Sequence, residues 1–125
     1  MGLLSGILGN AAEIDVGRIA DDLQPLLASD ERAEHAFQLI RDQIIFTDRR
    51  LLFINKQGVT GRKVEYLSVP YRAITRFSIE TAGHFDLDAE LKIWVSGAPE
   101  PLTQTFNRKL SIYTVQGVLA GYISR

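Results

Sequence analysis

The fold is decided by residues 83–94, which read Gly-His-Phe-Asp-Leu-Asp-Ala-Glu-Leu-Lys-Ile-Trp. The first half of this stretch is acidic and typical of a turn, and the second half alternates strictly between apolar and polar positions. In an extended chain the two kinds of position fall on opposite faces, Leu91, Ile93 and Val95 against Glu90, Lys92 and Trp94. The pattern predicts a loop that leads into a strand with one face on a core. The acidic residues are therefore expected at the rim of a sheet.

Six further apolar or β-branched runs lie around this stretch and are separated by turn residues, which is the pattern of consecutive antiparallel strands. We expect strands at residues 37–41, 43–47, 51–55, 63–69, 74–81, 89–96 and 102–107. Gly58 and Gly61 can take the positive φ that a turn between the third and fourth strands needs. Pro99 and Pro101 lack backbone donors and predict a turn before the seventh strand.

Helical patterns flank the strands. We expect a short helix before Gly9 and a second helix over about residues 13–24, which Pro25 ends because proline disfavours helical geometry at the preceding residue. A second apolar stripe, spaced for a helix, predicts a C-terminal helix over residues 110–124 that covers the sheets: Ile112, Val115, Leu119, Tyr122 and Ile123.

Several motifs along the chain resemble those of the bacterial pleckstrin-homology-like domains, over residues 34–125. They are Arg41-Asp42, Phe46-Thr47-Asp48-Arg49-Arg50, residues 57–63, Ser68-Val69-Pro70-Tyr71 and residues 80–94. The resemblance implies a mainly β (α+β) fold: a seven-stranded barrel of two orthogonal antiparallel sheets with a C-terminal capping helix. We expect one domain in all, with an N-terminal helical segment at residues 1–30 and the barrel and its helix at residues 31–125.

The resemblance also implies an assembly. Single-domain members of this family form cyclic homo-oligomers, with a pentamer as the implied stoichiometry, and their proposed role is protein–protein interaction with a partner that the sequence does not name. A ring closes through head-to-tail contacts, so each subunit needs two different contact surfaces. We take the strand edges of the barrel and the N-terminal segment as candidates for these surfaces.

The acidic stretch supplies the first candidate site. His84, Asp86, Asp88 and Glu90 alternate along the chain, so their side chains would share one face of a strand and could bind a hard cation. We favour a protein contact surface over a metal site, because carboxylates at a sheet rim also pair with neighbouring basic side chains. Glu80, Lys92 and Trp94 extend this surface, since aromatic residues are enriched in interface cores.

A second candidate site is basic. Arg49, Arg50, Arg62 and Lys63 lie in or near turns and could gather into a phosphate-binding patch. Together with the apolar N-terminal segment, this patch defines our alternative function, a peripheral membrane or lipid-binding module. We favour packing of the apolar segment within the oligomer, because it carries no Lys or Arg before Arg18 to attract anionic lipid.

Composition excludes several functional classes. Fourteen basic and fifteen acidic side chains give a net charge of −1, which offers no global attraction for nucleic acid. The chain has no cysteine and two histidines, and it lacks a glycine-rich nucleotide loop and a serine elbow. We therefore expect a non-enzymatic protein without a cofactor. The absence of a secretory signal pattern and of cysteine favours a cytoplasmic location.

Overall fold

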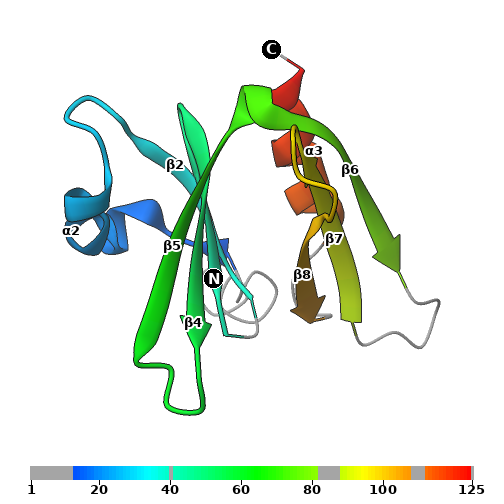
Figure 1. Cartoon of the computed structure of the whole chain (residues 1–125). Coiled ribbons are helices and arrows are strands. Elements are labelled where there is room, and N and C mark those ends of the chain that lie inside the picture. Colours follow the sequence, from blue (N-terminus) through cyan, green and yellow to red (C-terminus); the bar gives the residue numbers. More distant parts are fainter. Residues whose placement is uncertain (1–12, 40, 82–87, 108–111, 125) are drawn as a thin grey trace, which may run out of the picture.

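The computed structural model describes residues 13–39, 41–81, 88–107 and 112–124, which form two antiparallel sheets and a C-terminal helix (Figure 1). The first sheet contains, in order, β1 (Glu13–Ile14), β2 (Ala33–Gln38), β3 (Gln43–Thr47), β4 (Arg50–Gln57) and β5 (Lys63–Pro70). The second sheet contains β6 (Ile74–Thr81), β7 (Asp88–Val95) and β8 (Leu102–Asn107), and α3 (Ile112–Ile123) follows. The mainly β architecture with a C-terminal helix expected from the sequence is confirmed.

Most strand predictions agree with the structure, and the first one is displaced. Strand β2 ends at Gln38, whereas the sequence pattern predicted a strand over residues 37–41. The reason is a turn: the backbone N–H of Leu39 donates a hydrogen bond to the carbonyl of Asp42, 2.7 Å away. Gly58 and Gly61 have φ values of 77° and 69°, so both expected positive-φ positions are confirmed.

The N-terminal segment is less helical than its sequence predicted. Residues 13 and 14 form strand β1, which pairs with β2 at Phe37 and Ala36, where we expected the start of a helix. The side chain of Asp15 then accepts a hydrogen bond from the N–H of Gly17, 2.9 Å away, and starts the short helix η1 (Val16–Arg18). The α-helix that follows, α2 (Ala20–Leu23), ends before Pro25 as expected. The next three residues form the short 3-10 helix η2 (Gln24–Leu26). The helix expected before Gly9 lies outside the described residues.

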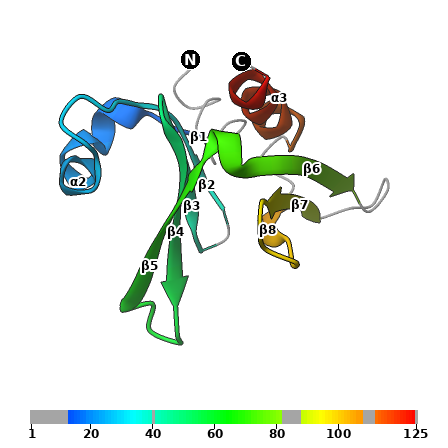
Figure 2. The same ribbon diagram turned by 45° about the horizontal axis from the view of Figure 1, so that its top comes forward.

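The first sheet is covered on both faces. Its inner face joins the second sheet and α3 in the main core, with the aromatic rings of Phe37, Phe46, Phe53 and Phe106 fully buried. Its outer face packs against the N-terminal segment, where Leu23 of α2 contacts Ala36, Ile45, Leu52 and Ile54 (Figures 1 and 2). Burial on both sides explains why β3 and β4 are continuous apolar runs and do not alternate.

A buried ion pair holds the N-terminal segment against the first sheet. The carboxylate of Glu31 accepts two hydrogen bonds from the guanidinium of Arg50 at 2.9 Å, and further bonds from Thr47 Oγ1 at 2.6 Å and Ala28 N–H at 2.9 Å. Burial raises the pKa of Glu31, but these hydrogen bonds and the charge of Arg50 outweigh burial and lower the pKa to about 2. Arg50 also donates to the Leu26 carbonyl and thereby ties η2 to β4.

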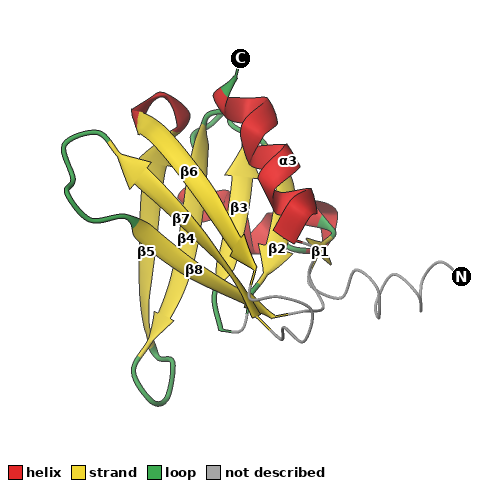
Figure 3. Ribbon diagram, turned by 90° about the vertical axis from the view of Figure 1, so that its right-hand side faces the viewer, coloured by secondary structure: helices red, strands yellow, loops and turns green. Residues whose placement is uncertain are grey.

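Helix α3 closes the open side between the two sheets. It lies between β6 of the second sheet and β2 of the first (Figure 3). Its Ile112, Val115 and Leu119 point into the main core, as the helical stripe predicted. This placement puts one side of the helix beside the edge of β2.

Candidate functional site

The outward side of the second sheet is the first candidate site, and we call it the contact face. It consists of Arg76, Ser78, Glu80, Glu90, Lys92, Trp94, Thr103 and Thr105, which are cross-strand neighbours on the three strands. In contrast to the first sheet, this sheet has no described helix or strand on its outer side (Figures 1 and 2). The alternation read from the sequence placed Glu90, Lys92 and Trp94 of this face correctly, opposite Leu91 and Ile93, which are buried.

Trp94 forms one end of the contact face. The guanidinium carbon of Arg76 lies 4.4 Å from the centre of the Trp94 ring, in cation–π geometry. The ring is partly buried, and Arg76 of β6 covers part of it. A partly covered tryptophan with an exposed arginine beside it combines the two residue types that most often dominate protein–protein binding energy.

Carboxylates form the other end of the contact face. Glu80 and Glu90 are direct cross-strand partners, and like charges in this arrangement are destabilising. Lys92 offsets part of this charge, with its Nζ 3.8 Å from Glu90 Oε1. Asp88 continues β7 toward this end, although only its backbone is described, and His84 and Asp86 lie outside the described residues. Glu80, Glu90 and Lys92 of the predicted surface thus lie on the same face of the second sheet as Trp94, with the two glutamates at the end away from it.

The predicted basic patch is not assembled. Arg49 pairs with Asp30 at 2.6 Å, and Arg50 is held inside by Glu31. Arg62 and Lys63 lie at the opposite end of the β4–β5 hairpin, where Lys63 pairs with Gln57 while Arg50 pairs with Pro70. An eight-residue strand places the two pairs about 23 Å apart. These four side chains therefore do not form one phosphate site.

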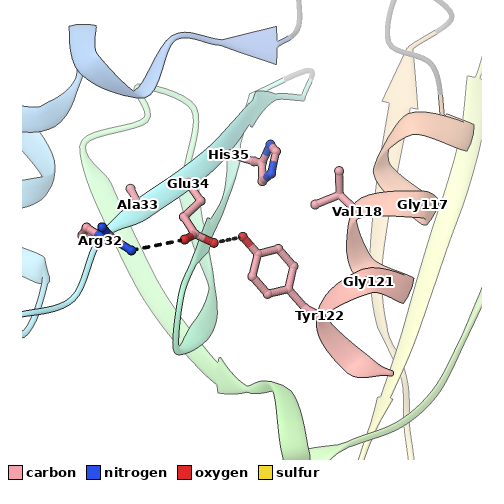
Figure 4. Close-up of a pocket in the computed structure, with 8 residues that line it drawn as sticks. All are labelled: Arg32, Ala33, Glu34, His35, Gly117, Val118, Gly121 and Tyr122. Atoms are coloured by element: carbon pink, nitrogen blue, oxygen red, sulfur yellow. Dashed lines mark hydrogen bonds and ion pairs between the residues drawn. The ribbon is translucent and has the colours of Figure 1, made fainter. Parts of the chain in front are cut away.

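A groove between β2 and α3 is the second candidate site, and we call it the α3 groove (Figure 4). Its volume is about 620 Å³, within the range of ligand-binding cavities of roughly 300–1,000 Å³. Arg32, Glu34 and His35 line one side, and Gly117, Gly121 and Tyr122 line the other. The hydroxyl of Tyr122 donates a short hydrogen bond to Glu34 Oε1.

A β-bulge aims two consecutive side chains of β2 into this groove. Ala33 pairs with Thr47 and His35 pairs with Phe46, so Glu34 is an extra residue with no direct partner on β3. Figure 4 shows Glu34 and His35 both extending from β2 toward α3. The His35 ring meets the rings of Phe46 and Tyr122 edge to face, at centroid distances of 6.4 and 6.3 Å.

Sequence reasoning missed the α3 groove. The bulge depends on the pairing with β3, which the pattern of β2 alone does not reveal. A usable signal was present in α3, where Gly117 and Gly121 stand four residues apart in a mostly apolar helix. Glycine in a helix interior is less stable than alanine by about 1 kcal/mol. Two glycines on one helical face therefore indicate a surface that is left open or that another chain segment approaches closely.

Metal and membrane sites receive no support from the described residues. No group of three or more His, Asp or Glu side chains gathers in the described part of the chain. Among the described helices, none is long and apolar enough to cross a bilayer.

Comparison with known proteins gives one consistent result. The family model described as bacterial PH domain matches residues 2–123. The chain is similar to the uncharacterized protein YjqA of Bacillus subtilis (strain 168), with 50% identity over 121 residues that cover 96% of this chain and 97% of the relative. It is also similar to YozO of the same organism, with 33% identity over 104 residues, 83% of this chain and 89% of the relative.

Two solved structures are similar over most of their length. A pleckstrin homology domain from Shewanella amazonensis SB2B has a TM-score of 0.86 and 47% identity, with 98% of each chain covered. A DUF1696 family protein with a pleckstrin-homology domain from Shewanella loihica PV-4 has a TM-score of 0.78 and 45% identity, covering 90% of this chain and 96% of that one.

Proposed function

Because the chain belongs to the bacterial pleckstrin-homology (PH) domain family, we propose that it is a non-enzymatic interaction module that binds protein through the contact face and assembles into a cyclic homo-oligomer. The observation that carries this proposal is the difference between the two sheets. One sheet is covered on both faces, whereas the other leaves Trp94, Arg76 and the Glu80–Glu90 pair accessible among the described residues.

The chemistry of the contact face fits a protein partner. A tryptophan offers a large apolar area that gains free energy when an interface removes it from water. The Glu80–Glu90 repulsion is relieved when a basic side chain approaches, so the acidic end favours a partner with Lys or Arg at the matching position. Ring assembly is the expectation that the family resemblance supplies, and a second, different surface on each protomer is needed to close the ring.

Substitution of Trp94 tests this proposal. We expect Trp94→Ala to weaken each interface by about 2 kcal/mol or more, roughly 30-fold in dissociation constant, because truncation of a central interface tryptophan typically has this effect. Sedimentation velocity of the full-length chain measures the change as a shift to smaller species. Tyr113→Ala is the matched control, since Tyr113 is an aromatic of α3 that is 65% exposed and lies outside the contact face. An unchanged size distribution for Trp94→Ala would refute the role of this face.

The membrane alternative loses part of its basis in this geometry. Arg50 is held by the buried Glu31, and Arg62 and Lys63 lie at the far end of the hairpin from Arg49, so the four side chains do not form one phosphate patch. We expect no co-sedimentation of the full-length chain with vesicles that contain anionic lipid. Binding that disappears when residues 1–12 are deleted would instead support a peripheral membrane module.

A further inference from the structure

The α3 groove has the properties of a peptide-binding site, and we propose that it binds an extended segment of a partner protein that places a lysine side chain against Glu34. The inference concerns a surface separate from the contact face and does not depend on ring assembly. It follows from three features of the groove: an incompletely paired strand edge, a wall opened by glycines and a carboxylate with one oxygen that accepts no hydrogen bond among the described residues.

The edge of β2 is only partly used by the chain itself. Strand β1 pairs with it at Phe37 and Ala36, and the chain then enters η1, which remains in contact with β2 but adds no strand pairing. In the described part of the chain, no strand continues along the same edge at His35, Glu34 and Ala33. A strand edge of this kind can accept an added extended segment through main-chain hydrogen bonds.

The opposite wall of the groove is open because of Gly117 and Gly121. A Cβ atom built on either glycine meets no atom within 4 Å, so packing within the protomer does not require glycine at either position. Because Gly117 and Gly121 have no side chains, space remains between this side of α3 and β2. An external backbone can therefore lie between β2 and α3, at a place where larger residues would fill the space (Figure 4).

Glu34 supplies the charge that selects the occupant. Its Oε1 accepts the hydrogen bond from Tyr122, whereas Oε2 has only Arg32 Nη2 at 4.0 Å among the described residues, too far for a hydrogen bond. The Glu34 side chain is 30% exposed, so the free oxygen faces a partly desolvated groove. An ammonium group can donate a charge-assisted hydrogen bond to this oxygen, which favours a cation.

Arg32 competes with the proposed lysine only weakly. Its side chain is 78% exposed, and exposed ion pairs are worth little. An incoming lysine can displace the guanidinium toward solvent. An anionic ligand would behave in the opposite way, because Arg32 would then be its main partner and Glu34 would repel it.

The test uses the ¹⁵N-labelled full-length chain and two five-residue peptides, each acetylated and amidated. One peptide is alanyl-valyl-lysyl-valyl-alanine, and the other has norleucine in place of lysine, which removes only the charged group. We expect saturable NMR shift changes at residues 33–35 and at the amides of Gly117 and Gly121 with the lysine peptide. The norleucine peptide should bind at least tenfold more weakly. Equal binding of the two peptides, or no saturable shift at these amides, would overturn the proposal.

Three variants and one control variant sharpen the result. Glu34→Gln keeps an acceptor for Tyr122 but removes the charge, so it should weaken lysine-peptide binding at least tenfold. Arg32→Ala should tighten binding by up to about fivefold, because it removes the competing cation. Gly121→Leu should abolish binding by filling the groove, and Tyr113→Ala should leave it unchanged. Weaker binding of the lysine peptide by Arg32→Ala would mean that Arg32 helps to hold the occupant, and it would contradict the proposal.

Discussion

The Glu31 carboxylate couples the stability of this domain to pH at the scale of a single residue. Its pKa is about 2 in the folded protein, against an ordinary value of 4.5. A lowered folded-state pKa means that the charged form stabilises the native state. This contribution is complete above about pH 4.5, and it is lost as the pH falls toward 2. A difference of about 2.5 pKa units corresponds to roughly 3 kcal/mol.

We therefore expect the free energy of unfolding to fall by about 3 kcal/mol from this group between pH 5 and pH 2. In Glu31→Gln the protein should be less stable at pH 6, because Arg50 loses its buried partner, and this part of the pH dependence should disappear. Urea denaturation at pH 6, 4 and 2.5 measures both effects. Asp30→Asn is the control, since Asp30 is an exposed neighbour and its loss should change stability little. Parallel pH profiles for the parent and Glu31→Gln would contradict this assignment.

Glycines in turns and in α3 should respond in opposite directions to the same substitution, which is a prediction at the scale of elements. Gly58 has a φ of 77°, so Gly58→Ala should destabilise the protein by about 1–2 kcal/mol through backbone strain. Gly117→Ala and Gly121→Ala should each stabilise it by up to about 1 kcal/mol, because the added methyl meets no atom and helix propensity improves. Thermal or urea unfolding measures these differences.

The matched control for α3 is Ala120→Gly, which should cost about 1 kcal/mol in the same helix. Loss of stability in Gly117→Ala or Gly121→Ala would mean that the fold itself requires glycine there. That result would also remove the argument that the α3 groove is kept open for a ligand.

Local pattern was sufficient to predict some elements and insufficient for others. Strand β6 follows from its own alternation, and the ends of the 57–63 turn follow from Gly58 and Gly61. The prediction that residues 13 and 14 begin a helix was wrong. They form a strand because they pair with Phe37 and Ala36, more than twenty positions away in the chain. The contact face could be predicted because a half-buried strand alternates. The α3 groove could not, because it depends on the bulge at Glu34 and on how α3 packs.

At the scale of the whole molecule, the difference in cover between the two sheets is the basis for the proposed assembly and binding. The N-terminal segment covers the outer face of the first sheet and is fastened there by Glu31 and Arg50. No described helix or strand covers the outer face of the second sheet, which carries Trp94 at one end and paired carboxylates at the other. Assembly through this face gives several copies of the α3 groove in one particle, so weak peptide binding would be strengthened by multivalency.

Native mass spectrometry of the full-length chain at near-physiological salt tests the central claim most directly. The account predicts one discrete assembly with the mass of a closed ring, converted to smaller species by Trp94→Ala and retained in Tyr113→Ala. A chain that remains monomeric at micromolar concentration would contradict the proposed cyclic assembly. An assembly that is indifferent to Trp94 would contradict the role given to the contact face.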